Sequence, residues 1–133
     1  MSTQTPGRVV VVGGGMVAHK FADELCRTSP DGDWTLTVIG DEPSAPYDRV
    51  HLSEYFDGRT PEALVMDQTP WSDPRVTLVI GDAVDRLDLD QRAVVTRSGR
   101  VEPYDNLVLA TGSWACTPRT EGTDLPGVFS YRT

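Results

Sequence analysis

Three consecutive glycines, Gly13-Gly14-Gly15, are the residues whose type and spacing suggest chemistry most clearly in this sequence. They follow the β-branched run Val9–Val12, which is typical of a strand buried on both faces, and they precede an amphipathic helical pattern. With Met16, Val17 and Ala18 they match the pattern GxGxxA. Such a turn brings the backbone close to a pyrophosphate, and the helix N-terminus that follows offers N–H groups and a positive dipole end. The segment therefore predicts a site for the phosphates of a dinucleotide.

Individual positions of this segment have expected roles. Gly13 allows the tight turn, Gly15 lets the backbone approach the pyrophosphate, and Ala18 permits close packing of the helix on the strand. Asp41 and Glu42 follow the next predicted strand, and one or the other would accept hydrogen bonds from the adenosine ribose hydroxyls. A carboxylate there would also repel a 2′-phosphate. The alternative is a pair of turn acids without a ligand.

Composition limits the class of protein. The chain has 133 residues, 38% hydrophobic and 24% charged, as expected for one globular domain or a piece of one. Its net charge of -8 and pI near 4.6 argue against nucleic acid or an anionic membrane as a partner. The two cysteines lie too far apart in sequence for a CxxC pair, and the beginning of the sequence is not typical of a signal peptide. We therefore expect a cytoplasmic protein.

The hydrophobic pattern predicts the elements that must position these residues. A helix over 17–25 and a strand over Trp34–Ile39 complete a β-α-β unit with parallel strands. Expected next are a short helix over Tyr47–Phe56, a helix start at Thr60-Pro61-Glu62, strands at Val76–Ile80, Val84–Leu89, Ala93–Thr96, Val101–Tyr104 and Leu107–Ala110, and a last candidate strand at Val128–Tyr131. A predicted antiparallel meander is formed by three of these runs, Val84–Leu89, Ala93–Thr96 and Val101–Tyr104. The prediction is a three-layer, Rossmann-like α/β fold with a parallel sheet and this meander.

A final motif, Tyr104-Asp105-Asn106-Leu107-Val108-Leu109-Ala110-Thr111-Gly112, completes a recognisable order. GxGxxA, an acid after the second strand, a meander and this motif together resemble the flavoproteins of the pyridine nucleotide–disulfide oxidoreductase type, which have two dinucleotide domains. Gly40–Pro43 and Pro46–Ser53 look like the N-terminal part of the large subunit of assimilatory NAD(P)H-dependent nitrite reductases. The related ferredoxin and rubredoxin reductases usually have a lysine where Glu54 stands, which favours the nitrite reductase branch.

The resemblance implies FAD as the cofactor and assigns further residues to it. Arg49 would lie along the pyrophosphate, Leu52 and Ser53 near the isoalloxazine, and the backbone around Val84 at the adenine. Ala110-Thr111-Gly112 would pass beside the phosphate and ribitol. Without the resemblance, Arg49 is more commonly a surface ion-pair partner, and Thr111-Gly112 only a turn that ends a strand. No catalytic or metal-ligating residue is predicted, and the expected cofactor-binding residues are Gly13, Gly15, Met16, Ala18, Asp41, Glu42, Arg49, Leu52, Ser53, Val84, Ala110, Thr111 and Gly112. Asp41 aligns better than Glu42 with the acid of the family.

The resemblance also predicts the organisation of the parent protein. Residues 1–7 are expected to be a disordered leader, 8–112 the N-terminal segment of an FAD-binding domain, and 113–133 a linker toward an NAD(P)H domain. The chain would then be the incomplete first half of a two-dinucleotide-domain flavoprotein. Hydride would pass from NAD(P)H to FAD, and electrons onward through an iron–sulfur cluster and siroheme to nitrite, in nitrate assimilation. Partners would be the other domains of the same protein or a small subunit, and the isolated chain is expected to be inactive and to bind FAD poorly.

Three alternatives remain open at the level of sequence. The chain could be a ferredoxin- or rubredoxin-reductase-like FAD protein, an NAD-binding dehydrogenase domain that uses the same loop and Asp41, or a non-catalytic fragment. His19 is expected to face solvent or another domain, and His51 to lie within the segment near the flavin. Trp34, Trp71 and Trp114 are interpreted as packing residues.

Overall fold

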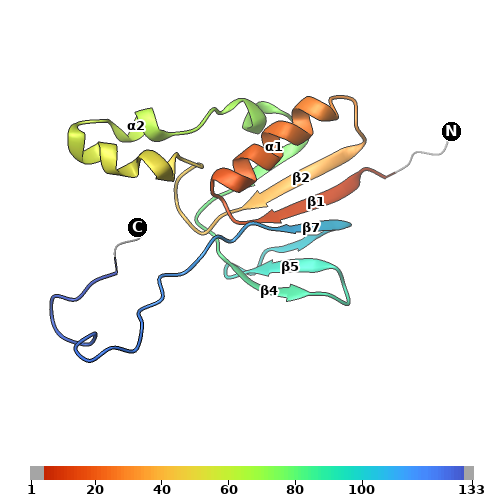
Figure 1. The fold of residues 1–133 in the computed structure, drawn as a ribbon. Coiled ribbons are helices and arrows are strands. Elements are labelled where there is room, and N and C mark those ends of the chain that lie inside the picture. The colour runs from red at the N-terminus through yellow and green to blue at the C-terminus, as the bar shows by residue number, and fades with distance from the viewer. Residues whose placement is uncertain (1–4, 131–133) are drawn as a thin grey trace.

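The computed structural model describes residues 5–130, which form three layers (Figure 1). Helix α1 (Met16–Thr28) covers one face of a parallel sheet, and a smaller antiparallel sheet lies on the other side. The parallel sheet has the order β3-β2-β1-β7, and the antiparallel sheet has the order β4-β5-β6. The strands are β1 (Gly7–Val12), β2 (Trp34–Ile39), β3 (Val76–Val79), β4 (Val84–Asp88), β5 (Ala93–Thr96), β6 (Val101–Pro103) and β7 (Asn106–Leu109). The predicted three-layer α/β fold is confirmed.

The β-branched run in β1 is buried on both faces, as predicted. Val11 packs in the core between the sheet and α1, whereas Val10 and Val12 pack in a second core that includes Val94 of the meander. This alternation follows from the two-residue period of side chains along a strand. On the helix, Ala18 and Ala22 are fully buried against the sheet, and their small side chains let α1 approach it closely.

The motif that leads into β7 attaches this strand to β1. The carboxylate of Asp105 accepts hydrogen bonds from the backbone N–H of Arg8 at 2.8 Å and from its guanidinium, and the Asp105 N–H donates to the Arg8 carbonyl at 2.8 Å. These bonds hold the pKa of Asp105 down to about 2. Tyr104, beside it, is buried in the second core. The Tyr-Asp pair of the motif is therefore structural.

Residues 46–66, which we call the arm, project from the sheet beside α1 (Figure 1). They contain the 3₁₀ helix η1 (Arg49–Asp57) and the short helix α2 (Pro61–Leu64), and η2 (Thr69–Ser72) follows them. The carboxylate of Asp48 caps η1 by accepting hydrogen bonds from the N–H groups of Val50 and His51, which is why the helix begins at Arg49 and not at the predicted Tyr47. Pro61 stands at the predicted first position of α2, and Thr60 makes no side-chain cap bond.

Some expectations need correction. The strand predicted over Val128–Tyr131 is not formed by residues 128–130, and Tyr131 lies outside the described residues. The predicted leader lies partly outside them too, since residues 1–4 are not described, and β1 already begins at Gly7. Trp114 is 89% exposed, so it is not a packing residue, whereas Trp34 is 8% exposed and lies in the core. His19 faces neither solvent nor another domain, because it is only 6% exposed.

Candidate functional site

The site lies at the edge of the parallel sheet where its strands end. Because the four strands are parallel, the segments that follow them meet at this one edge. The chain leaves β1 through α1 to β2 on one side, while β7 pairs with β1 on the other side. Such a change in strand order opens a crevice beside the ends of the strands, and ligands of open α/β sheets bind there. The glycine loop after β1 occupies this position.

Gly13 and Gly14 let three backbone segments meet without side chains between them. Gly13 has φ +117°, and a Cβ on it would lie 2.1 Å from the carbonyl oxygen of Ala110, which follows β7. A Cβ on Gly14 would lie 3.0 Å from the Cα of Gly40, which follows β2. The loop is therefore held between the ends of β2 and β7. These glycines are required by the fold itself.

Gly15 differs because its open side faces away from the protein. A Cβ there would meet nothing within 4 Å among the described residues, and the φ of -94° is one that any residue adopts. Gly15 is the N-cap of α1, yet no side chain caps the helix and no acidic residue lies in its first turn. Met16 is the first residue of α1, and the N–H groups of the first turn remain free to bind an anion. This open, uncapped helix start fits a phosphate group.

The two predicted acids have different environments. Asp41 is exposed and makes no hydrogen bond or ion pair with another described residue. Glu42 accepts a hydrogen bond from the Tyr47 hydroxyl at 2.9 Å through Oε2 and forms an ion pair with Arg49 through Oε1. Arg49 is therefore an ion-pair partner of Glu42, as one sequence interpretation expected. Of these two acids, Asp41 is the one whose carboxylate oxygens have no partner among the described residues.

Two further predicted segments also come to this edge. Ala110 hydrogen bonds through its N–H to the carbonyl of Val12 at 2.8 Å, and the exposed Thr111 and Gly112 follow it. Val84, at the start of β4, is half-buried and close in sequence to Asp82, whose N–H donates to Gly40. The glycine loop, both acids, Val84 and Ala110–Gly112 are thus gathered around the ends of β1, β2, β3 and β7.

Leu52 and Ser53 lie on the arm, away from the sheet edge. An open groove of about 590 Å³ runs along the arm, and Leu52 lines it together with Tyr47, Tyr55 and Leu64. Ser53 is exposed on η1. Glu42 also lines the groove, so the groove reaches the end of β2. It could take a flat apolar group whose polar end lies at the sheet edge.

Sequence reasoning missed the side-chain network at the base of the arm. Tyr47 was not singled out, although its ring lies 5.1 Å from the Arg49 guanidinium carbon. His51 Nδ1 lies 2.6 Å from Asp48 Oδ2, and this contact is the largest cause of the lowered pKa of Asp48. No motif indicated these pairs, which join the first turns of η1 to its N-cap and to the residue before it.

His19 connects α1 to the segment after the arm. Its Nε2 donates to the carbonyl oxygen of Asp67 at 2.7 Å, and its ring packs edge-on against Trp71 with centroids 5.7 Å apart. His19 Nδ1 and Trp71 Nε1 are buried and have no partner among the described residues. In the neutral tautomer that donates through Nε2, Nδ1 accepts and the indole N–H donates.

The described residues contain no group of three or more histidine, cysteine or acidic side chains that could hold a metal ion. Over the same residues, no helix combines the length and apolar character needed to cross a membrane.

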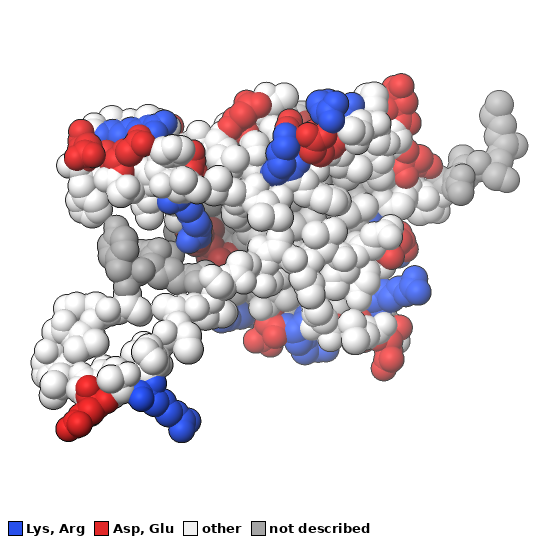
Figure 2. Space-filling view, in the orientation of Figure 1, with Lys and Arg blue, Asp and Glu red and all other residues white. Residues whose placement is uncertain are grey.

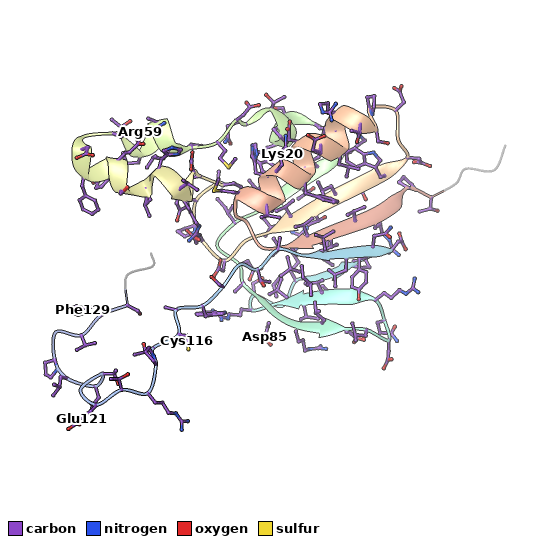
Figure 3. The ribbon with its side chains drawn as sticks, viewed as in Figure 1. Lys20, Arg59, Asp85, Cys116, Glu121 and Phe129 are labelled. Carbon is purple, nitrogen blue, oxygen red and sulfur yellow. The ribbon has the colours of Figure 1, made fainter. Side chains whose placement is uncertain are left out.

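Cys26 is half-buried, and burial raises the pKa of its thiol. Cys116 is exposed on the tail, which Figure 3 shows apart from the sheets.

This fold and this edge define a dinucleotide-binding α/β protein. Residues 7–133 match the pyridine nucleotide-disulphide oxidoreductase family, and the chain belongs to it. It is 33% identical over 127 residues to the nitrite reductase (NADH) large subunit of Escherichia coli. This alignment covers 95% of this chain and 15% of that protein. It is 38% identical over 139 residues to the nitrite reductase [NAD(P)H] of Emericella nidulans, covering 98% of this chain and 13% of that protein. A ferredoxin reductase structure from Rhodopseudomonas palustris matches with a TM-score of 0.78 and 27% identity, over 95% of this chain and 31% of that one. The chain thus spans a minor part of the relatives it matches.

Proposed function

We propose that this chain is the N-terminal FAD-binding segment of an NAD(P)H-dependent oxidoreductase of the nitrite reductase large-subunit type. The observation that carries the proposal is the glycine loop, with an open face at Gly15 and an uncapped helix start. The adenosine diphosphate half of FAD would bind at the sheet edge. Its phosphates would accept hydrogen bonds from the first turn of α1, and its ribose would donate to Asp41.

The flavin half would extend toward the arm. Ala110–Gly112 would pass beside the ribitol, and Arg49 would contact the pyrophosphate. The groove beside Leu52 is apolar enough to receive part of the isoalloxazine. Bound FAD would supply hydride chemistry, accepting a hydride from NAD(P)H. The residues of this chain hold and orient the cofactor, and none is proposed as an acid, base or nucleophile.

The nitrite reductase assignment rests on the two relatives named above and on Glu54. In the lysine position of ferredoxin reductases this chain has an acid, which forms an ion pair with Arg59 of the arm. We therefore propose that electrons pass to a nitrite-reducing centre, with siroheme and an iron–sulfur cluster, in further domains or a small subunit, in the cytoplasm. A ferredoxin-reductase-like function is the second candidate, favoured by the likeness to the Rhodopseudomonas palustris structure.

The test is a titration with FAD of the purified protein with any sequence that naturally follows Thr133, because the isolated chain is expected to bind FAD poorly. Binding is followed by quenching of flavin fluorescence, with ADP and NAD⁺ as competitors. We expect ADP to compete, because it carries the adenosine and pyrophosphate contacts, and NAD⁺ to compete weakly. Binding of NAD⁺ without FAD would favour the dehydrogenase alternative. Binding of neither would favour the non-catalytic fragment.

The electron acceptor needs a separate experiment on the protein with any sequence that naturally follows Thr133. NADH-dependent consumption of nitrite is expected, while reduction of an added ferredoxin without nitrite consumption would support the second candidate.

A further inference from the structure

Glu42, Tyr47 and Arg49 form a side-chain cluster where the arm joins the sheet. Both carboxylate oxygens of Glu42 are engaged, Oε2 by the Tyr47 hydroxyl at 2.9 Å and Oε1 by the Arg49 guanidinium. The guanidinium carbon lies 5.1 Å from the centre of the Tyr47 ring, within the range of a cation–π contact. Figure 2 shows basic and acidic side chains together at this junction. Tyr47 therefore supports both charged groups.

The backbone on each side of the cluster is fixed. The carbonyl oxygen of Glu42 accepts a hydrogen bond from the Gly81 N–H at 2.8 Å, which joins this loop to the end of β3. Tyr47 pairs with Val65 in an antiparallel bridge inside the arm. Glu42 and Arg49 side chains are each 33% exposed, so their ion pair is partly shielded from water. The cluster is thus a fixed feature of the sheet edge, next to Asp41.

The ion pair leaves most of the hydrogen-bonding capacity of Arg49 unused. Arg49 donates one hydrogen bond to Glu42, from Nη2 of its guanidinium. Its side chain makes no other hydrogen bond with a described residue. A guanidinium carries several N–H donors in a rigid plane, which matches the oxygens of a phosphate. The remaining donors can therefore bind a diphosphate while Glu42 keeps its contact.

We propose that Glu42 is a positioning residue, which orients Arg49 toward the diphosphate of the cofactor, and that Asp41 alone binds the ribose. This inference rests on the proposed dinucleotide function and divides the work between the two neighbouring acids. Arg49 and Tyr47 already bind the carboxylate oxygens of Glu42 and would compete there with a ribose hydroxyl. Asp41 has no such competitor among the described residues. Holding Arg49 in place removes the cost of ordering a long side chain on binding, which corresponds to about 3- to 10-fold in affinity.

A double-mutant cycle with two probes tests the inference, on the protein with any sequence that naturally follows Thr133. The probes are ADP, which has ribose and diphosphate, and adenosine, which has ribose only. Glu42→Ala should weaken ADP binding about 3- to 10-fold and leave adenosine binding unchanged. In the Arg49→Ala background the same substitution should have no further effect. A purely structural role would not produce this dependence on the probe.

Three matched variants complete the experiment. Glu42→Gln keeps an oxygen for Arg49 and should lose less ADP affinity than Glu42→Ala, and Tyr47→Phe should show a smaller loss that is again limited to ADP. Asp41→Ala should weaken adenosine and ADP alike, and its effect should add to that of Arg49→Ala. Melting temperatures of all variants establish that they are folded.

The outcomes separate the two hypotheses. If the wild-type protein binds neither ADP nor FAD, the proposed function itself fails. If it binds them, the positioning role is overturned when Glu42→Ala weakens adenosine as much as ADP, when its effect adds to that of Arg49→Ala, or when ADP affinity does not fall. A gain in ADP affinity would mean that Glu42 competes with phosphate for Arg49.

Discussion

Replacing Gly15 by serine should separate binding from folding, because this glycine is open to solvent. Its Cβ would meet nothing within 4 Å of the described chain, and its backbone already has a negative φ of -94°. Serine is a favourable N-cap residue, so Gly15→Ser should change the free energy of unfolding by no more than about 0.5 kcal/mol. The serine hydroxyl would, however, accept a hydrogen bond from the same N–H groups that a phosphate needs.

The expected effect on binding is large. Each charge-assisted hydrogen bond from the helix start contributes about 1.5–3 kcal/mol, and losing one would raise the Kd for FAD about 10- to 100-fold. Gly13→Ala is the matched contrast. A Cβ at Gly13 would lie 2.1 Å from the Ala110 oxygen and would need φ +117°, so the variant should lose about 2–5 kcal/mol of stability.

Urea denaturation followed by tryptophan fluorescence gives the stabilities, and titration with FAD gives the affinities, both on the protein with any sequence that naturally follows Thr133. The expected pattern is stable and weakly binding for Gly15→Ser, but unstable for Gly13→Ala. Wild-type affinity in a folded Gly15→Ser protein would refute the reasoning that the phosphates approach this face. Wild-type stability in Gly13→Ala would refute the steric account of the loop.

Other parts of the fold give further predictions. Ala18→Leu should cost about 1–3 kcal/mol of unfolding free energy, measured in urea, because Ala18 is fully buried between α1 and the sheet; an unchanged midpoint would contradict the packing described. The pKa of Asp105 is held at about 2, below its ordinary value, so its bonds to Arg8 stabilise the fold at neutral pH and lose this effect as the pH falls toward about 2. Asp105→Asn should therefore lower the urea midpoint at neutral pH, and the two midpoints should converge near pH 2; a constant difference would argue against this linkage. A thiol reagent near pH 8 should modify Cys116 quickly and Cys26 slowly, since burial raises the pKa of Cys26. Cys116→Ser should remove the fast phase, and a fast phase that persists would assign it to Cys26.

The sequence predicted the elements whose residues carry a local signal. The run Val9–Val12 has the same apolar character on both faces, and the structure buries both. Trp34–Ile39 was predicted with the bounds that β2 has. The strand predicted over Val128–Tyr131 is not formed by its described residues 128–130, because an apolar run becomes a strand only where another strand pairs with it.

The side-chain partners at the site could not be predicted in the same way. Nothing in the spacing of Glu42, Tyr47 and Arg49 indicates that they meet, because their contact depends on the path of the loop between β2 and η1. His19 was expected to face solvent or another domain, because it follows the glycine loop on the helix. It is buried because η2 and the residues before it cover that part of α1, a long-range contact with no local signature.

Some positions of the site tolerate substitution and others do not. The difference follows from the close contacts of Gly13 with Ala110 and of Gly14 with Gly40. Position 13 lies against the backbone of Ala110, and positions 14 and 40 lie against each other, so a side chain introduced at any of them would need a compensating shift of a neighbouring segment. Gly15 and Asp41 are not limited in this way. Gly15 has open space beside it, and Asp41 makes no hydrogen bond or ion pair with a described residue. A library that seeks a different cofactor preference should therefore keep the first group constant and randomise the second. Variants obtained in this way would report on ligand selection without a background of misfolded protein.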